Sequence, residues 1–177
     1  MKLLSVNVGK AEPIAAKSGL SGINKHPQIG NVFVHKLGLD GDIICDLKNH
    51  GGLDQAVYLY GQPDYEWWSD ELQTKLIPGT FGENLTIDGF QSAEIYVGDR
   101  FTINDLVLEV TFPRIPCVTL AARFADSHFP KRFLKANRPG AYCRVLKEGN
   151  VKTSDKVAYQ MTNGEKRPIL DLLDAFR

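Results

Sequence analysis

The stretch EIYVGDRFTINDLVLEV, residues 94–110, decides the fold class because it reads as two strands joined by a tight turn at Asn104 and Asp105. Further runs combine Val, Ile, Tyr or Phe with turn residues at their ends, which is the pattern of β-strands. These runs are residues 3–9, 31–38, 56–61, 141–149 and 156–161. Short strands at this spacing predict a mainly β protein, built as a barrel or a sandwich.

Helical signals are fewer and lie between or after these runs. Residues 62–76 begin with Pro63 at a first-turn position and continue with apolar residues at i, i+3 and i+7, which predicts one amphipathic helix. Residues 119–137 predict two short helices interrupted near Pro130. Residues 168–176 predict a terminal helix with one apolar stripe, which packs either on the protein's own sheet or on a partner subunit in a homodimer.

Length and charge narrow the function classes. The chain has 177 residues, so we expect one domain over residues 1–177, with a C-terminal helical extension at about 165–177. Lys plus Arg and Asp plus Glu number 21 each, so no global basic field favours a nucleic-acid polymer or an anionic membrane. The N-terminal apolar run is too short for a signal peptide, and we expect a cytoplasmic protein.

The three cysteines are widely separated and form neither a disulfide framework nor a zinc-finger spacing. By default each is a small buried apolar residue, and Cys45 and Cys143 have no setting that suggests otherwise. Cys117 differs because it ends FPRIPC, where two prolines fix an extended path after a strand. A helix beginning just after Cys117, together with Arg114, would favour the thiolate, which is a soft metal ligand or a nucleophile.

Two glycine-rich segments are the other candidates for chemistry. His50, Gly51 and Gly52 could turn backbone N–H groups toward an anion beside an imidazole, or could form only a turn before a strand. In PGTFGENLTIDGF, residues 78–90, Glu83 and Asn84 bring a carboxylate and an amide into one loop. Asn84 could bind a heterocycle or only cap a turn. Hydrolysis by a cysteine and histidine pair is a weaker alternative, because no nucleophile signature surrounds Cys117.

Taken in order, GLDGD, HGGLDQAVYLY, FGENLTIDG, VGDRF and PRIPC resemble the MOSC family, the domain named for the C-terminal part of molybdenum cofactor sulfurases. Within that family, the sequence resembles the stand-alone bacterial YiiM-like branch. The motifs run in register over about residues 38–117, with KSGLSGINKHP ahead of them, and the resemblance weakens after residue 145. It implies a β-barrel, closed or partly open, with a few short peripheral helices.

The resemblance also implies a molybdenum cofactor in a cleft, with Cys117 as the protein's ligand to molybdenum and as the catalytic residue. Relatives reduce N-hydroxylated compounds, including hydroxylaminopurines and amidoximes, to amines. A pterin cofactor carries a phosphate and a polar ring, so nests, basic groups and an amide are expected around it. The candidate cofactor-binding residues are Cys117, Arg114, Asn84, His50, Gly51, Gly52, Lys17 and Ser18, with Lys25 as a further candidate at the phosphate end.

The leading hypothesis is therefore a molybdenum-dependent reductase of a small N-hydroxylated substrate, with no need for pyridoxal phosphate. The chain has no dinucleotide-binding G-x-G-x-x-G and no iron–sulfur cysteine spacing, so an external flavin or iron–sulfur reductase would supply electrons. A second hypothesis is a sulfur carrier that holds a persulfide on Cys117 and exchanges it with donor and acceptor proteins. A third is a cofactor-binding module without catalysis.

Overall fold

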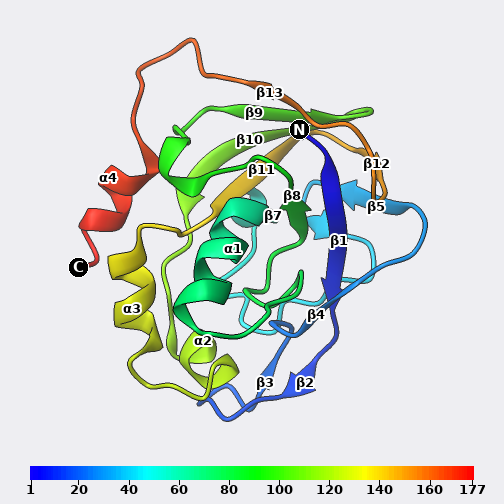
Figure 1. Ribbon diagram of the computed structural model, residues 1–177. Helices are drawn as coiled ribbons and strands as arrows, with labels where there is room; N and C mark the ends of the chain where they lie inside the picture. Colours follow the sequence, from blue (N-terminus) through cyan, green and yellow to red (C-terminus); the bar gives the residue numbers. More distant parts are fainter.

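The computed structural model describes residues 1–177 and is dominated by one large sheet of eight strands (Figure 1). Neighbouring strands are antiparallel except for β7 and β8, which run parallel. In spatial order the strands are β13 (Ala158–Gln160), β9 (Arg100–Ile103), β10 (Leu106–Pro113), β11 (Ala141–Lys147), β7 (Val57–Gly61), β8 (Leu85–Ile87), β1 (Leu3–Gly9) and β4 (Lys25–Pro27).

The large sheet does not close into a barrel, so the predicted closed barrel is wrong, and the structure shows an open, mainly β arrangement with few helices. The two edge strands, β13 and β4, have three residues each and do not pair. Pro27 at the end of β4 has no N–H to donate to a further strand. The gap is bridged only near the start of β1, where Leu3 and Met1 exchange backbone hydrogen bonds with residues 154–157.

Two smaller sheets complete the β structure. One contains β12 (Gly149–Val151), β5 (Val32–His35) and β6 (Gly38–Leu39), and the other pairs β2 (Glu12–Pro13) with β3 (Leu20–Ser21). The first of these supplies Val32, Val34 and Val151 to a core of 23 buried residues that it shares with the large sheet. The predicted mainly β fold is therefore confirmed.

The predicted turn at Asn104 and Asp105 is also confirmed. Asn104 adopts a left-handed φ of 53°, and Ile103 pairs with Leu106 across the turn. The strand before it is shorter than predicted, because a single 3₁₀ turn, η2 (Ser92–Glu94), and a loop occupy residues 92–99. Another 3₁₀ turn, η1 (Leu53–Gln55), precedes β7.

Four short helices cover parts of the sheet: α1 (Gln62–Glu71), α2 (Val118–Arg123), α3 (Phe129–Ala136) and α4 (Ile169–Asp174). α1 ends five residues before the predicted end of its segment, and Gln73 beyond it takes a φ of 49°, which an α-helix cannot continue. The break between α2 and α3 falls before Pro130, because Pro130 lies in the first turn of α3, where a missing N–H costs nothing. α4 buries Ile169 and Leu173 against the protein's own core. No helix has the length and apolar character needed to span a membrane.

The two faces of the central strands carry different side chains. On β7, Val57 and Leu59 join the large core, whereas Tyr58 and Tyr60 join a second cluster of nine buried residues under α1, α2 and α3. This second cluster is mostly aromatic and includes Trp68, Phe81, Phe129 and Phe133. Strand alternation thus places one apolar core on one face and an aromatic layer on the other, beside the candidate site.

Candidate functional site

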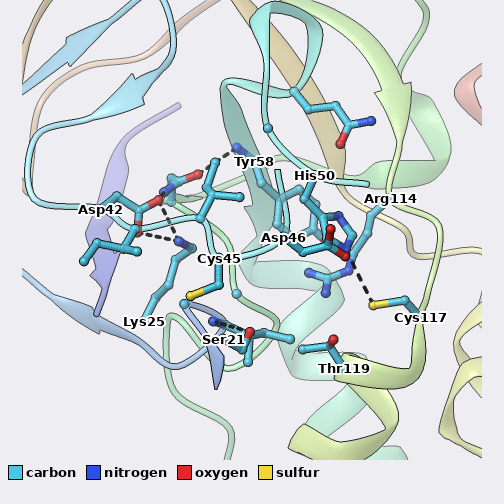
Figure 2. A pocket seen from close by; sticks show the side chains of 18 of the residues that line it. Ser21, Lys25, Asp42, Cys45, Asp46, His50, Tyr58, Arg114, Cys117 and Thr119 are labelled. Atoms are coloured by element: carbon cyan, nitrogen blue, oxygen red, sulfur yellow. Dashed lines mark hydrogen bonds and ion pairs between the residues drawn. The ribbon is translucent and has the colours of Figure 1, made fainter. Parts of the chain in front are cut away.

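A pocket opens between the loops that precede β4 and β7 and the start of α2 (Figure 2). Its lining includes residues 18, 20–23 and 42–46 and several charged and polar side chains. Five of these side chains carry the argument that follows: Lys25, Asp42, His50, Arg114 and Cys117. They come from four separate stretches of the chain, with Arg114 and Cys117 in the same one, so the fold brings the four stretches together.

Cys117 stands at the junction between β10 and α2. It has extended backbone angles, φ −131° and ψ 176°, and it is the N-cap residue of α2. Its carbonyl oxygen accepts hydrogen bonds from the N–H groups of Leu120 and Ala121, at 3.0 and 3.2 Å. The thiol is half-buried and its Sγ lies 3.9 Å from Nε2 of His50 (Figure 2). The predicted helix directly after this cysteine is therefore confirmed.

The surroundings of Cys117 favour its thiolate. Burial is the largest single influence and raises the pKa of the thiol. The hydrogen bond from His50, the charge of Arg114 and the N–H of Leu120 together outweigh burial and lower the pKa of Cys117 from 9.0 to about 6. At neutral pH the thiolate therefore predominates, which is the form that binds a soft metal or attacks an electrophile.

Arg114 supplies a cation that cannot move away from the thiolate. The side chain is 5% exposed, its Nη1 donates to the carbonyl oxygen of Phe81, and its guanidinium carbon lies 5.2 Å from the ring centroid of Tyr58. Its Nε has no hydrogen-bond partner. Arg114 thus links the end of β10 to the loop that contains Phe81, and its Nε is a hydrogen-bond donor without a protein partner.

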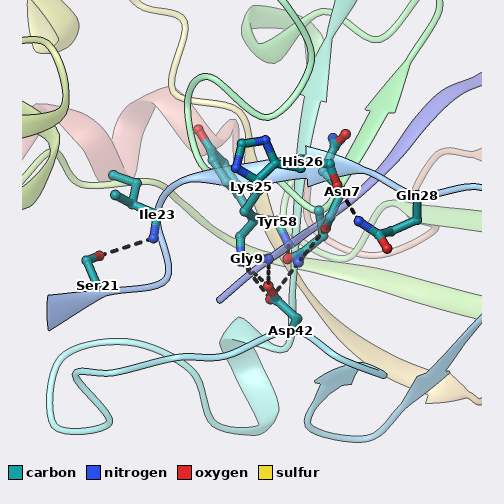
Figure 3. A network of polar contacts seen from close by, with 10 residues as sticks. Asn7, Gly9, Ser21, Ile23, Lys25, His26, Gln28, Asp42 and Tyr58 are labelled. Atoms are coloured by element: carbon teal, nitrogen blue, oxygen red, sulfur yellow. Dashed lines mark hydrogen bonds and ion pairs between the residues drawn. The ribbon is translucent and has the colours of Figure 1, made fainter. Parts of the chain in front are cut away.

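A second polar cluster, formed by Lys25, Asp42 and Asn84, also lines the pocket. Figure 3 shows the side chains of Lys25 and Asp42 pointing toward each other. Nζ of Lys25 lies 2.5 and 2.7 Å from the two carboxylate oxygens of Asp42. Asp42 also accepts from the backbone N–H of Gly9 at 2.7 Å and from the side-chain amide of Asn84 at 2.8 Å. Burial lowers the pKa of Lys25, and the ion pair with Asp42 opposes that shift.

Asn84 is held by the protein itself. Its Oδ1 accepts from the backbone N–H of Tyr58 at 3.0 Å, while its Nδ2 donates to Asp42. Asn84 lines the pocket as predicted, but both ends of its amide already bond protein groups. Its neighbour Glu83 is fully buried, with one oxygen accepting from Tyr65, Gly79 and Thr86 at 2.7 Å, and burial raises the pKa of Glu83. Glu83 therefore fixes the loop.

Only some of the predicted glycines and N-terminal candidates line the pocket. Gly51 lines it with a φ of 81°, and a Cβ there would lie 2.9 Å from Cδ1 of Ile44. Gly52 has a φ of 80° but is exposed and caps η1 instead. Ser18 lines the pocket, whereas Lys17 does not. Lys25, the further candidate, also lines the pocket.

Several pocket residues had no distinct signal in the sequence. Asp42 and Asp46 read as turn-forming aspartates, and Tyr58 and Tyr142 read as ordinary strand residues. Cys45 is exposed and lines the pocket, so its default assignment as a buried apolar residue is wrong, whereas the same assignment for Cys143 is confirmed. The quoted motif GLDGD was the one available hint for Asp42, because it places that carboxylate next to a tight turn.

The donor set fits the cofactor that the sequence implies. A thiolate suits molybdenum that already has sulfur ligands. The unpaired Nε of Arg114 and the unpaired Oε1 of Gln55, both in the pocket lining, offer a donor and an acceptor to a polar ring. Cys117 would hold the metal, and Lys25 with Ser18 would face an anionic group. No group of three or more His, Cys, Asp or Glu side chains forms a separate metal site.

Comparisons with known proteins agree with this picture. The family model described as the MOSC domain matches residues 46–158. "Uncharacterized protein YflK" of Bacillus subtilis is 35% identical over 166 residues, which cover 93% of this chain and 75% of that protein. A Gibberella moniliformis protein named "Reductase" is 32% identical over 161 residues, covering 88% of this chain but 28% of its own length. The crystal structure of YiiM from Geobacillus stearothermophilus aligns with a TM-score of 0.80 at 26% identity, covering 98% of this chain and 82% of that one.

Proposed function

This chain belongs to the MOSC domain family, and from that premise we propose that it binds a molybdenum cofactor and reduces N-hydroxylated compounds to amines. The observation that carries the proposal is the position of Cys117 in the pocket, 3.9 Å from Nε2 of His50 and in the same lining as the buried cation of Arg114. The name "Reductase" of one relative agrees with a redox function, although this chain spans only 28% of that protein.

The reaction consumes two electrons and two protons: an R–NH–OH compound becomes R–NH₂, and the hydroxyl leaves as water. When bound, the molybdenum cofactor supplies the two-electron chemistry. Cys117 would hold the metal through its thiolate, and the charge of Arg114 favours that thiolate over the neutral thiol. His50 lies 3.9 Å from the same sulfur, so its ring is placed to hold a proton at Nε2 beside the reacting group.

The electrons must come from another protein, because the chain has neither a dinucleotide-binding motif nor clustered cysteines. A flavin or iron–sulfur reductase is the partner class that we propose. The cytoplasmic location belongs to the same proposal, since a reducing compartment keeps an exposed thiol such as Cys45 and the Cys117 thiolate unoxidised.

The direct test is turnover by the purified holoprotein with reduced methyl viologen as the electron donor. We expect 6-hydroxylaminopurine and benzamidoxime to yield adenine and benzamidine. Cys117→Ser should lower the rate by at least about 100-fold, the scale of losing a metal-site group. Cys143→Ser is the matched control. Cys143 lies in β11 and is buried in the large apolar core, not in the pocket, so this variant should keep the activity. A loaded wild-type protein that produces neither amine would refute the reductase.

A sulfur carrier is the second candidate, favoured by the same low pKa and by the partial exposure of Cys117. A thiolate of this kind can accept sulfur as a persulfide from a donor persulfide, which leaves the donor as a thiolate. Incubation of the cofactor-free protein with a cysteine desulfurase and cysteine, followed by mass spectrometry, should then show one added sulfur on Cys117. An unmodified Cys117 would exclude this role. Cofactor retention without any turnover would instead indicate a non-catalytic binding module.

A further inference from the structure

Positive charge is concentrated in the segment that follows the pocket cysteine directly. Residues 118–138 contain five lysines and arginines and one aspartate, a net charge of +4 in a chain whose total net charge is zero. The segment comprises α2, α3 and the turns beside them. The remaining 156 residues are therefore net acidic, so the molecule has a charge asymmetry that its overall composition conceals.

This basic segment is joined to the pocket. Cys117 is the N-cap residue of α2, and α3 packs against α2 at one side of the molecule (Figure 1). α2 has six residues and is therefore about 9 Å long, so its last residue, Arg123, is separated from the cysteine by fewer than two turns of helix. A protein that covers these helices would lie beside the candidate metal ligand.

The cations fall into two groups according to whether the protein itself neutralises them. Arg132 bonds Glu71 and Asp126 at 3.4 and 3.5 Å, and Arg138 bonds the buried Asp64 at 2.6 Å. The other three cations, Arg123, Lys131 and Lys135, are exposed and make no ion pair. These three residues are called the cationic face below.

The helix pattern explains why the cationic face points outward. In α3, Phe129 and Phe133 are spaced i, i+4 and are buried in the aromatic cluster, which anchors the helix to the protein. Lys131 and Lys135 are also spaced i, i+4, so they form a second stripe that faces solvent. The core packing of α3 thus does not require either lysine.

Two apolar features accompany the cationic face. A groove between α1 and α3 is lined by Trp67, Trp68 and Ala136 together with the charged side chains of Glu71, Arg132 and Lys135. Val118, next to Cys117, is 69% exposed. Tryptophan and arginine are enriched at the centres of protein interfaces, and an exposed aliphatic residue beside a charged rim adds contact area.

We propose that α2 and α3 form the docking surface for an electron-transfer protein whose flavin or iron–sulfur cluster is surrounded by acidic residues. This inference rests on the proposed reductase function, which needs electrons from outside. Opposite charges would steer the carrier to the side of the molecule where Cys117 lies. A nucleic acid is the less suitable occupant, because the cationic face has three free cations in a chain with no net charge.

The test compares two double variants of the holoprotein that change net charge equally. Lys131→Glu with Lys135→Glu reverses the charge of two of the three residues of the cationic face. Lys152→Glu with Lys166→Glu reverses the charge of two exposed lysines that lie outside both the pocket and the helices. An acidic flavodoxin and an acidic [2Fe–2S] ferredoxin serve as donors, and reduced methyl viologen serves as a donor that needs no docking. Carrier affinity is also measured directly by isothermal titration calorimetry at low and high salt.

We expect the Lys131 and Lys135 variant to lose about tenfold or more in carrier-driven kcat/KM and in carrier affinity, the scale of electrostatic steering. Viologen-driven turnover should stay within about twofold of wild type, and high salt should weaken the carrier-driven rate of the wild type and of the Lys152 and Lys166 variant more than that of the Lys131 and Lys135 variant. Equal carrier-driven rates in both double variants would overturn the docking surface. A wild-type protein that accepts electrons from viologen but from neither carrier would also overturn it. Failure with viologen would instead refute the reductase itself.

Discussion

Tyr142 and Cys143 are neighbours on β11, and their side chains point to opposite faces of the sheet. One face is an apolar core, and the other carries an aromatic layer and a polar pocket. Cys143 belongs to the large apolar core and is 0% exposed, and burial there raises the pKa of its thiol. Tyr142 faces the aromatic layer and the pocket, where Arg114 and Cys117 lie. In that pocket the pKa of the Cys117 thiol is lowered to about 6.

The difference shows that the same side chain acquires opposite chemistry from its surroundings. The core offers Cys143 no donor and no cation, so the neutral thiol is the stable form. The pocket surrounds Cys117 with an imidazole, a guanidinium and a helix N–H. Pocket electrostatics come at a cost, however, because charges such as Lys25 and Asp42 must be kept paired away from water.

The largest expected contrast is in thiol reactivity. In a Cys45→Ser background, which removes the exposed pocket thiol, iodoacetamide at pH 7 should alkylate Cys117 in the cofactor-free native protein at least about 1000-fold faster than Cys143. Cys143 becomes reachable only when the core opens, an event that costs a large part of the free energy of unfolding, about 5–15 kcal/mol for proteins generally. Peptide mass spectrometry over time measures both rates, and comparable rates would remove the distinction between the two faces.

The ion pair in the pocket should dominate the effects on stability. Asp42→Ala leaves Lys25 as a buried unpaired cation, which costs about 3–5 kcal/mol in the free energy of unfolding. Asp40→Ala is the matched control, because Asp40 pairs with the exposed His35 and its loss should cost less than about 1 kcal/mol. Urea unfolding of both variants gives the comparison. Similar losses in the two variants would show that the buried pair contributes no more than an exposed one.

Replacing each cysteine by serine should change the free energy of unfolding by different amounts at the two positions. Cys143→Ser introduces a hydroxyl into the apolar core and should lower the free energy of unfolding by about 1–3 kcal/mol. Cys117→Ser places the hydroxyl in a polar, half-buried pocket and should change it by less than about 0.5 kcal/mol. The midpoints of urea unfolding at pH 7 report both values. A larger loss for Cys117→Ser would mean that this thiol has a structural role.

The smallest effect concerns His50. The alkylation rate of Cys117 should fall as the pH drops through about 6, because protonation removes the thiolate. His50→Ala removes a hydrogen bond that lowers the pKa of Cys117, so the midpoint should move to higher pH. At pH 5 the rate should fall about fivefold, which corresponds to a hydrogen bond of about 1 kcal/mol. An unchanged midpoint would assign the low pKa to Arg114 and the helix N–H instead.

Much of the fold was predictable from local pattern. The hairpin at Asn104, the strands around it and the helix that begins at Val118 follow from short-range rules of turns and alternation. The failure of the sheet to close into a barrel was not predictable, because closure depends on whether two distant edge strands meet. β4 and β13 are too short to do so, and no local signal gives that outcome. The end of α1 also escaped prediction, since Gln73 leaves the helix without a proline or glycine.

The site was predictable where rigidity or resemblance marked a residue. Cys117 stood out because of the prolines before it, and Arg114 and His50 by their place in motifs. Lys25 and Asp42 meet only through tertiary structure, across a loop that includes the small sheet of β5 and β6, so their pairing has no spacing signature. Asn84 was predicted as a ligand to the cofactor, and the structure adds a scaffolding role by bonding its amide to Asp42 and Tyr58.

The central claim is that the thiolate of Cys117 holds the metal of a molybdenum cofactor. Its most direct test is the molybdenum and pterin content of the wild type, Cys117→Ser and Cys143→Ser proteins, purified in parallel from a host that makes the cofactor. We expect about one molybdenum and one pterin per wild-type and Cys143→Ser chain, and a loss of molybdenum of about 10-fold or more in Cys117→Ser. Equal molybdenum in all three proteins, or none in the wild type, would contradict the claim.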